Sequence, residues 1–353
     1  MVKDRLKVKG IGMTFFLLSA LLFCGCGKEE SLEAVPYDGE EYLRISEMVL
    51  EEEELESAAE SYEPLININE TLSVPTCITK VEDTWFIVDC YHDKVIYNSE
   101  LNPSLYTYHV MASDLSKPHT MASDGTVYLV DDTENNRVVI YEKVGDKFIN
   151  TQAFNEIGNR PHFTVYDENT DSFYVWSSES GEMYCFRRKA DSTRVYLTDI
   201  RKIEELSDIY VRSFSIIDGD VYFVSGVSES GEEPRIYQCN LSDLSIKKSF
   251  EVPDELAGMV QITKIEDMYY ITVSTDITGN QDYATIIRTA SLSDLGEQEY
   301  EDIYEEYFIG GGTPYYINKV DDTYFLTEHR LVGHSIWSFK VVDGEIADVE
   351  SVY

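Results

Sequence analysis

Basic residues are scarce in this sequence. It contains 28 lysines and arginines against 66 aspartates and glutamates, so its formal net charge is −38. A negative field of this strength repels nucleic acid and anionic membrane surfaces. The charge therefore excludes nucleic acid as a partner and argues against generic polyanion binding, while it permits a basic or cationic partner.

Several motifs that carry chemistry are also missing. No glycine-rich phosphate loop follows a strand and opens a helix, and no Gly-x-Ser-x-Gly elbow or Cys-x-x-Cys pair occurs after residue 26. The acidic loops contain no spaced Asp-x-Asp-x-Asp motif of the kind that binds calcium. The sequence therefore implies no certain cofactor, and a divalent metal (Zn or Ca) stays an open alternative.

The sequence has one long apolar run, and it is near the N-terminus. Ile11 to Phe23 is too short to span a bilayer comfortably and follows four basic residues, which is the pattern of a secretory signal. Leu21 to Cys26 resembles a bacterial lipobox, with the small Gly25 before Cys26. The resemblance implies a signal peptide over residues 1–25, lipid attachment at Cys26, and anchoring to the bacterial cell membrane on the side facing away from the cytoplasm. A plain secretory signal or an uncleaved anchor is the alternative.

Residues 26–64 differ in composition from the rest of the chain. This stretch contains the run Glu51 to Glu54, with Lys28 and Arg44 as its only basic residues. It has too few apolar groups to order a whole segment, and its like charges favour an extended chain. We expect an acidic flexible tether, with at most one short helix between Glu40 and Tyr62.

Four cysteines follow the lipobox: Cys77, Cys90, Cys185 and Cys239. A hairpin turn at Glu82-Asp83 would place Cys77 opposite Val88, which leaves Cys90 one diagonal step away and makes a bridge between the two cysteines marginal. Free buried thiols are therefore expected.

A repeated passage dominates residues 65–353. An apolar segment, a tight polar turn and a strand in which aromatic residues alternate with others recur in this order six times. The copies are PTCITKVEDTWFIVD from Pro75, PHTMASDGTVYLVD from Pro118, PHFTVYDENTDSFYVW from Pro161, SFSIIDGDVYFVS from Ser213, QITKIEDMYYITVS from Gln261 and PYYINKVDDTYFLTE from Pro314. The copies are about 40 to 50 residues apart, which is typical of propeller blades. We therefore predict an all-β fold with six four-stranded blades, in which residues 65–69 could add a strand that closes the ring.

One stretch of the second copy points to a family. Asp131-Asp132 and Asn135-Asn136-Arg137, followed by the apolar Val138 to Tyr141, resemble an NHL repeat, as does the preceding Pro118-His119. The resemblance is close in the second copy, partial in the first and third, and weak in the others. It implies an NHL-like six-bladed propeller, a fold that serves in binding scaffolds, lyases and hydrolases alike.

The predicted topology gathers histidines at one rim of the ring. Loops that lead into inner strands and loops that leave second strands lie on the same face, because these two strands form an antiparallel hairpin. This rule places five histidines on one arc: His92, His119, His162, His329 and His334. His119, His162, His92 and His329 could bind a metal at the channel mouth, and some NHL-like lyases hold zinc in this way. Alternatively, His119 and His162 are repeat residues that hydrogen-bond the backbone of a neighbouring blade.

The same rim should carry Arg160, Trp176, Arg330 and Tyr315. Arginine and aromatic residues on one surface are typical of recognition sites, although Trp176 could instead pack between blades. The sequence therefore favours a membrane-anchored propeller that binds a protein, peptide or glycan at one rim. A metal-dependent lyase or hydrolase that uses the histidines is the alternative.

Overall fold

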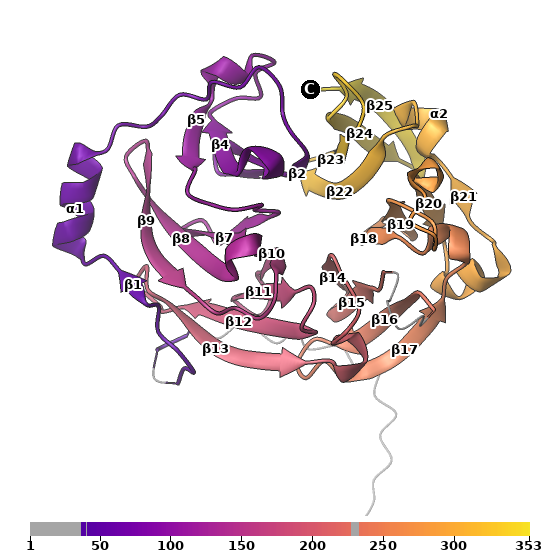
Figure 1. Ribbon diagram of the computed structural model, residues 1–353, viewed down its shortest axis with the longest axis horizontal. Coiled ribbons are helices and arrows are strands. Elements are labelled where there is room, and N and C mark those ends of the chain that lie inside the picture. Colours follow the sequence, from indigo (N-terminus) through magenta and orange to yellow (C-terminus); the bar gives the residue numbers. More distant parts are fainter. Residues whose placement is uncertain (1–36, 40, 227–232) are drawn as a thin grey trace, which may run out of the picture. The chain divides into compact units, whose positions relative to one another are not determined.

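The computed structural model of the protein describes residues 37–39, 41–226 and 233–353, so the predicted signal peptide and the predicted lipidation site Cys26 lie outside the described residues. From residue 75 onward the chain forms six antiparallel sheets set around one axis (Figure 1). The prediction of an all-β, six-bladed propeller is confirmed. Within the part of the chain that is described, no helix is both long and apolar enough to cross a bilayer.

Each blade contains four strands that follow one another along the chain from the axis outwards. The first three blades have the following strands: β2 (Pro75–Val81), β3 (Thr84–Asp89), β4 (Lys94–Asn98) and β5 (His109–Ala112); β6 (Met121–Ser123), β7 (Val127–Asp132), β8 (Arg137–Val144) and β9 (Lys147–Phe154); β10 (Pro161–Asp167), β11 (Ser172–Ser177), β12 (Glu182–Arg188) and β13 (Val195–Lys202).

The other three blades have these strands: β14 (Phe214–Ile217), β15 (Asp220–Val224), β16 (Arg235–Asn240) and β17 (Ile246–Glu251); β18 (Met259–Ile265), β19 (Met268–Val273), β20 (Thr285–Thr289) and β21 (Glu301–Asp302); β22 (Thr313–Val320), β23 (Thr323–His329), β24 (Ile336–Val342) and β25 (Glu345–Ser351). A short helix, α2 (Tyr304–Phe308), connects blade 5 to blade 6.

The hydrophobic core lies between neighbouring blades. Phe86 of blade 1 packs on Tyr128 and Phe148 of blade 2, with ring centroids 5.4 and 5.3 Å away. Trp176 of blade 3 packs in the same way on Phe223 of blade 4, at 4.4 Å. Since strand residues alternate between the two faces of a sheet, each blade contributes one apolar face to each neighbour. Stacking around the ring therefore buries surfaces that a single blade would leave exposed.

The inner hairpins of blades 2 and 4 both turn at an Asp-Gly pair but differ in conformation. Asp218 and Gly219 both have positive φ, 52° and 83°, as a type I′ turn requires. The turn of blade 2 is different: only Gly125 has positive φ, and the Asp124 carboxylate accepts hydrogen bonds from the backbone N–H groups of Thr126 and Val127, both at 2.9 Å. In blade 1 Cys77 pairs with Val88, as the sequence predicted.

Blade 6 closes the ring against blade 1 without exchanging a strand. Asn318 Nδ2 donates to the carbonyl of Ile78 at 2.7 Å, and the hydroxyls of Tyr353 and Tyr108 lie 2.5 Å apart. Residues 65–67 pair with β5, at the outer edge of blade 1, through the bonds from Val110 N to Leu65 O and from Asn67 N to Tyr108 O. This segment therefore extends blade 1 and adds no strand to blade 6.

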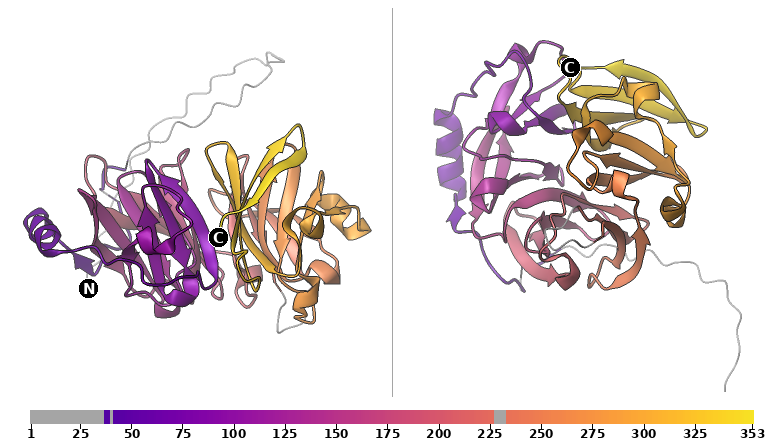
Figure 2. Two further views of the ribbon diagram at one scale, coloured as in Figure 1. Left: turned by 90° about the horizontal axis from the view of Figure 1, so that it is seen from above. Right: turned by 45° about the vertical axis from the view of Figure 1, so that its right-hand side comes forward.

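The structure places residues 41–64 against the ring, in contrast to the expected extended tether. Strand β1 (Met48–Val49) pairs with β9 as a fifth, outermost strand of blade 2, and α1 (Glu52–Ser61) runs along the outside of that blade (Figures 1 and 2). Lys147 Nζ donates to the carbonyl of Ala59 at 2.8 Å, and the Arg194 guanidinium pairs with Glu51 at 2.7 Å. Edge pairing and these cationic partners therefore hold this acidic segment on the blades; residues 26–36 lie outside the described residues.

Candidate ligand site at the channel mouth

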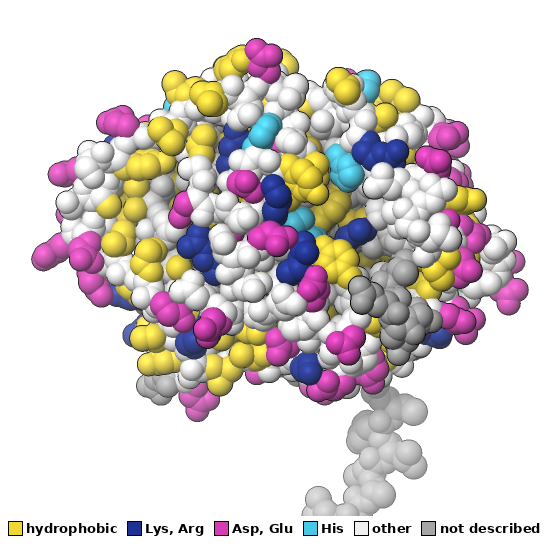
Figure 3. Space-filling view, in the orientation of Figure 1, with side chains coloured by type: hydrophobic (Ala, Val, Ile, Leu, Met, Phe, Trp, Pro, Cys, Tyr) yellow, Lys and Arg dark blue, Asp and Glu magenta, His cyan; other side chains and the backbone are white. Residues whose placement is uncertain are grey.

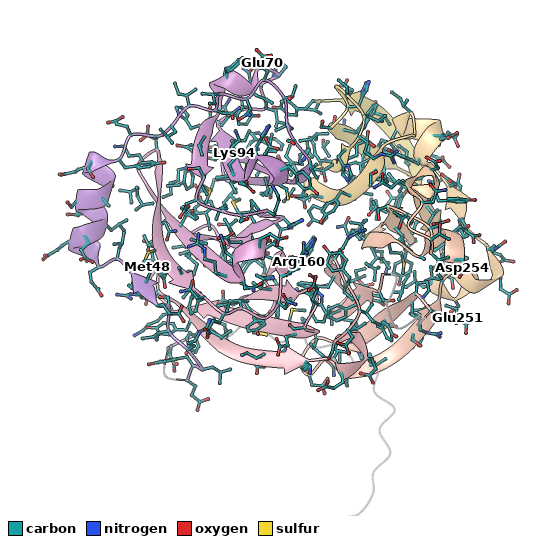
Figure 4. The ribbon with its side chains drawn as sticks, viewed as in Figure 1. Met48, Glu70, Lys94, Arg160, Glu251 and Asp254 are labelled. Carbon is teal, nitrogen blue, oxygen red and sulfur yellow. The ribbon has the colours of Figure 1, made fainter. Side chains whose placement is uncertain are left out.

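A cavity of about 320 Å³ lies where all six blades meet at one end of the channel. Each blade contributes to its wall, for example with Thr76, His119, His162, Arg212, Ser274 and Tyr315 in chain order. Figure 3 shows basic and histidine side chains around the hollow at the centre of this face, and Figure 4 shows Arg160 pointing toward the same centre. The cavity therefore lies on the face that the topology predicts, where loops that lead into inner strands and loops that leave second strands come together.

A repeated turn positions two of the cationic residues. After β7 the chain turns through Asn136, which has φ of 50° and whose side-chain oxygen accepts the backbone N–H of Arg160 at 2.8 Å. After β3 the equivalent Asp93, with φ of 55°, accepts the backbone N–H of Lys117 at 2.9 Å. Lys117 and Arg160 themselves have positive φ, 53° and 61°, a conformation uncommon for residues with a Cβ. The turn of one blade thus holds the residue that precedes the Pro-His pair of the next blade.

His119 and His162 stack on each other with ring centroids 3.6 Å apart. His162 Nδ1 donates to the carbonyl of Arg212 at 2.9 Å, so its Nε2 accepts the hydroxyl of Tyr210 at 3.0 Å. His119 Nδ1 contacts Thr133 Oγ1 at 2.9 Å, while Thr133 donates its proton to Asp131. Both imidazoles therefore carry their proton on Nδ1 and are held by protein partners.

The cavity keeps its imidazoles neutral. Burial, reinforced by the Arg160 and Arg212 guanidinium groups, lowers the pKa of His119 to about 3. Burial and the neighbouring His119 lower the pKa of His162 well below its usual value. Burial and Arg330 lower the pKa of His329, which also lines the cavity, to about 4. At neutral pH the positive charge of the cavity therefore comes from lysine and arginine alone.

Three cations face this cavity, with one carboxylate, Glu134, among the residues that line it. Arg160 pairs with Glu134 at 2.9 Å and with Glu179 at 3.6 Å, and Lys117 pairs with Asp93 at 3.2 Å. Arg212 differs from these two cations: it donates to the Ser274 hydroxyl and lies over the Tyr210 ring, but no described carboxylate pairs with it. In a chain with a net charge of −38, three cations gathered at one cavity are a local exception, and of the three only Arg212 has no carboxylate partner among the described residues.

Two hydroxyl groups in the wall have no partner among the described residues. Tyr315 is 8% exposed, and its hydroxyl, unlike that of Tyr210, makes no hydrogen bond with the described protein. Thr76 is fully buried, and its Oγ1 is unpartnered. Buried polar groups normally find partners, because an unmade hydrogen bond costs about 1–3 kcal/mol. These groups are therefore available to a ligand.

The four histidines expected to bind a metal do not form a set. His119, His162 and His329 line the cavity, but His92 Nδ1 pairs with Asp89 at 2.7 Å and its Nε2 contacts Asn69 at 3.1 Å, away from the other three. Over residues 37–353, excluding the undescribed ones, no group of three His, Cys, Asp or Glu side chains is arranged to hold a metal ion. Because the imidazoles are already bonded to protein atoms, these residues do not fit a zinc or calcium site.

The other expected rim residues have separate positions. Arg160 and Tyr315 line the cavity, as expected for a binding site. Trp176 is fully buried, and its indole N–H donates to the carbonyl of Val211 at 3.1 Å. Of the two alternatives for Trp176, an exposed position at the rim is therefore wrong and packing between blades is observed. Arg330 lies in the wall of a second cavity and donates to the carbonyl of Gln281, a residue shared by both cavities.

The sequence interpretation missed Arg212, Tyr210, Lys117 and Thr76. Arg212 lies in the loop before β14 and Lys117 in the loop before β6, at the rim where the topology rule had placed the histidines. The same rule, applied to every polar residue before an inner strand, would have found both cations.

No protein-family model matches the chain, and no curated protein sequence is similar enough to match it. Solved structures share its fold. A virginiamycin B lyase from Staphylococcus aureus, in a catalytically inactive form with quinupristin, has a TM-score of 0.53 and 15% identity over 82% of this chain and 88% of its own. A protein from Bacteroides uniformis that is proposed to be a 6-phosphogluconolactonase has a TM-score of 0.54 and 12% identity over 80% of this chain and 86% of its own. Hydrazine synthase from Kuenenia stuttgartiensis has a TM-score of 0.50 and 13% identity over 78% and 79%. At these identities the similarity shows the propeller fold alone.

Proposed function

We propose that this protein is a lipid-anchored binding protein that faces away from the bacterial cytoplasm and captures its partner through an anionic group at the channel mouth. The observation that carries the proposal is the cluster of Lys117, Arg160 and Arg212 at one cavity of an otherwise very acidic chain, in which no described carboxylate pairs with Arg212. The partner is a protein, peptide or glycan that presents this group at its end or on a short segment. A long polyanion would be repelled by the acidic surface around the mouth.

Arg160 and Arg212 are the residues that would hold the anion. Their guanidinium groups lie 5.6 and 5.4 Å from the centroid of the same Tyr210 ring, so both are close to one point of the wall. Each charge-assisted hydrogen bond contributes about 1.5–3 kcal/mol, and guanidinium groups match the planar geometry of carboxylates. The neutral His162 holds this part of the wall in place, because it donates to Arg212 O and accepts from the Tyr210 hydroxyl.

The proposal is tested by titrating the mature protein with pairs of probes that differ in charge. Citrate, trigalacturonate and an acidic hexapeptide are compared with an uncharged polyol, trigalactose and the matching amide hexapeptide by calorimetry. At least one anionic probe should bind, and Arg160→Gln with Arg212→Gln should weaken it by 100-fold or more. The control variant Arg235→Gln with Lys248→Gln, on β16 and β17 in the outer part of blade 4, should leave binding unchanged. Equal binding of the uncharged probes, or full binding by the double variant at the mouth, would refute the proposal.

The membrane anchor is tested separately. The native chain expressed in a bacterial host should carry lipid and partition into detergent, and Cys26→Ser should abolish both. Partition of the Cys26→Ser protein into detergent would show that the lipid is not the anchor.

A further inference from the structure

We infer that the anionic partner group belongs to a sugar: the channel mouth is a site for an acidic carbohydrate unit, such as a uronic acid, at the end of a glycan or in a short oligosaccharide. This inference rests on the proposed function and specifies its ligand class. It is drawn from the groups of the wall that do not carry charge.

The wall offers very little to an aliphatic side chain. Val74 is the one aliphatic residue among those that line the cavity; the others are charged, hydroxylated, amide-bearing or aromatic. Protein and peptide partners usually bind by burying apolar anchors in matching pockets. A sugar acid needs the opposite combination, namely one charge partner and several hydrogen-bonding groups around a compact ring.

The unpartnered hydroxyls provide part of that combination. The Tyr315 hydroxyl and Thr76 Oγ1 can each donate and accept, as sugar hydroxyls do, and neither has a partner among the described residues. Thr76 Oγ1 is itself buried without a partner, so a ligand hydroxyl would satisfy it, and the Tyr315 hydroxyl offers a second free hydrogen-bonding group on the same wall. Gln281 and Thr313 add further amide and hydroxyl groups on the side of blades 5 and 6.

The positions of these groups match an acidic sugar. Arg160, Arg212 and Tyr210 lie before the inner strands of blades 3 and 4, whereas Thr76 and Tyr315 lie in the inner strands of blades 1 and 6, which adjoin where the ring closes. The charge partners and the free hydroxyls therefore face the cavity from different sides. A cavity of about 320 Å³ is at the lower end of small-ligand sites, about 300–1,000 Å³, which suits one or two sugar units.

The test compares trigalacturonate, trigalactose, citrate and an acidic hexapeptide in titrations of the mature protein; sulfated and phosphorylated monosaccharides are added to separate a carboxylate from other oxyanions on a sugar. Trigalacturonate should bind at least tenfold tighter than citrate or the peptide, and trigalactose should not bind measurably. If citrate or the peptide binds as tightly as any acidic sugar, the inference about sugars fails while the proposed function stands. If no anionic probe binds, both fail. Binding of only the sulfated or phosphorylated sugars would keep the acidic sugar and exclude the carboxylate.

Two variants remove the free hydroxyls with little change in shape: Tyr315→Phe and Thr76→Val. Each should weaken trigalacturonate binding about tenfold, while the melting temperature of the free protein stays the same or rises, because an unsatisfied buried hydroxyl is lost. Thr164→Val is the matched control, since Thr164 Oγ1 is also buried and unpartnered but Thr164 does not line the cavity. Binding by Tyr315→Phe and Thr76→Val equal to that of the Thr164→Val control would overturn the inference.

Discussion

Two cavities among the described residues are nearly equal in size and opposite in chemistry. The channel mouth measures about 320 Å³ and carries Lys117, Arg160 and Arg212, while a cavity of about 310 Å³ between blades 5 and 6 carries Glu255, Asp282, Asp302, Glu305 and one arginine, Arg330. In the acidic cavity two of the carboxylates have partners: Asp302 accepts from the Thr285 hydroxyl at 2.7 Å and from Tyr304 N at 3.1 Å, and Glu255 accepts from Gln298 at 3.0 Å.

The difference shows that volume alone does not identify a ligand site. Because the whole chain is rich in acidic residues, acidic side chains in a cavity are expected and do not by themselves indicate a ligand site. The channel mouth departs from the composition in charge and also keeps hydroxyls unpartnered. We therefore assign the ligand to the mouth and treat the acidic cavity as an internal control.

The largest expected effect comes from neutralising the charges of each cavity in turn. Arg160→Gln with Arg212→Gln should weaken binding of the best anionic probe by more than 100-fold, or about 3 kcal/mol, because two charge-assisted hydrogen bonds are lost. Glu255→Gln with Glu305→Gln removes the same number of charges from the acidic cavity and should change the dissociation constant less than twofold. Titration calorimetry measures both, and comparable losses in the two variants would remove the distinction between the cavities.

The second effect is a loss of stability in acid that originates at the channel mouth. The pKa of His119 is lowered from 6.5 to about 3 by burial and by Arg160, so the unfolded chain binds a proton between these values that the folded protein does not. Stability is therefore fully present above pH 6.5 and falls as the pH drops, by about 2–3 kcal/mol for this group at pH 4.5. Urea unfolding at pH 7.5 and 4.5 should show a smaller difference in His119→Gln than in the native protein. An equal difference in the two proteins would show that the buried imidazole does not titrate as described.

An effect of comparable size and opposite sign is expected at Glu328, which accepts a hydrogen bond from Tyr304, a residue in the wall of the acidic cavity. Glu328 is fully buried; burial raises its pKa to about 7, while hydrogen bonds from Tyr304 and Trp337 limit the rise. Because the folded pKa exceeds the unfolded value, this group favours folding at low pH and loses about 3 kcal/mol of stability as the pH rises from about 4.5 past 7. Glu328→Gln should remove this part of the pH dependence, measured by urea unfolding at pH 5 and 8. If the variant kept the native pH dependence, the carboxyl would not be the group that titrates.

The smallest expected effect concerns Lys117, which contacts the Tyr91 ring, whereas Arg160 and Arg212 both lie over Tyr210. It lies 4.6 Å from the centroid of the Tyr91 ring and pairs with the partly exposed Asp93, so solvent screens much of its charge. Lys117→Gln should weaken binding only two- to fivefold and should reduce the dependence of the dissociation constant on salt. A loss as large as that of the Arg160 and Arg212 variant would mean that the charge partners have been misassigned.

Much of the fold could be predicted from the sequence because its signals are local. The hairpin turns and period-two strands recur six times, and they specified the pairing of Cys77 with Val88 and a fourth strand in the last blade, observed as β25. The attachment of residues 41–64 was not predictable in this way. Strand β1 has two residues, and its pairing with β9 depends on an outer edge that exists only after blade 2 has folded.

The candidate site was predicted only in part, for two physical reasons. The net charge is an average over the chain, so it concealed that Lys117 and Arg212 join the predicted Arg160 at one cavity, each from the loop before the inner strand of a successive blade. Trp176 was placed at the rim because it is near the end of β11, but alternation along the strand turns its side chain toward Phe223 in the core. The position of a residue along a strand sets its distance from the rim of the ring. Because side chains alternate along a strand, the odd or even position of the residue decides whether its side chain faces the cavity or the neighbouring blade.

The most direct test of the assignment is a crystal structure of the protein with its tightest-binding anionic probe. We predict that the acidic group lies between the Arg160 and Arg212 guanidinium groups, with the Tyr315 hydroxyl bonded to the ligand. Density for the probe in the cavity between blades 5 and 6, with only water at the channel mouth, would contradict the account.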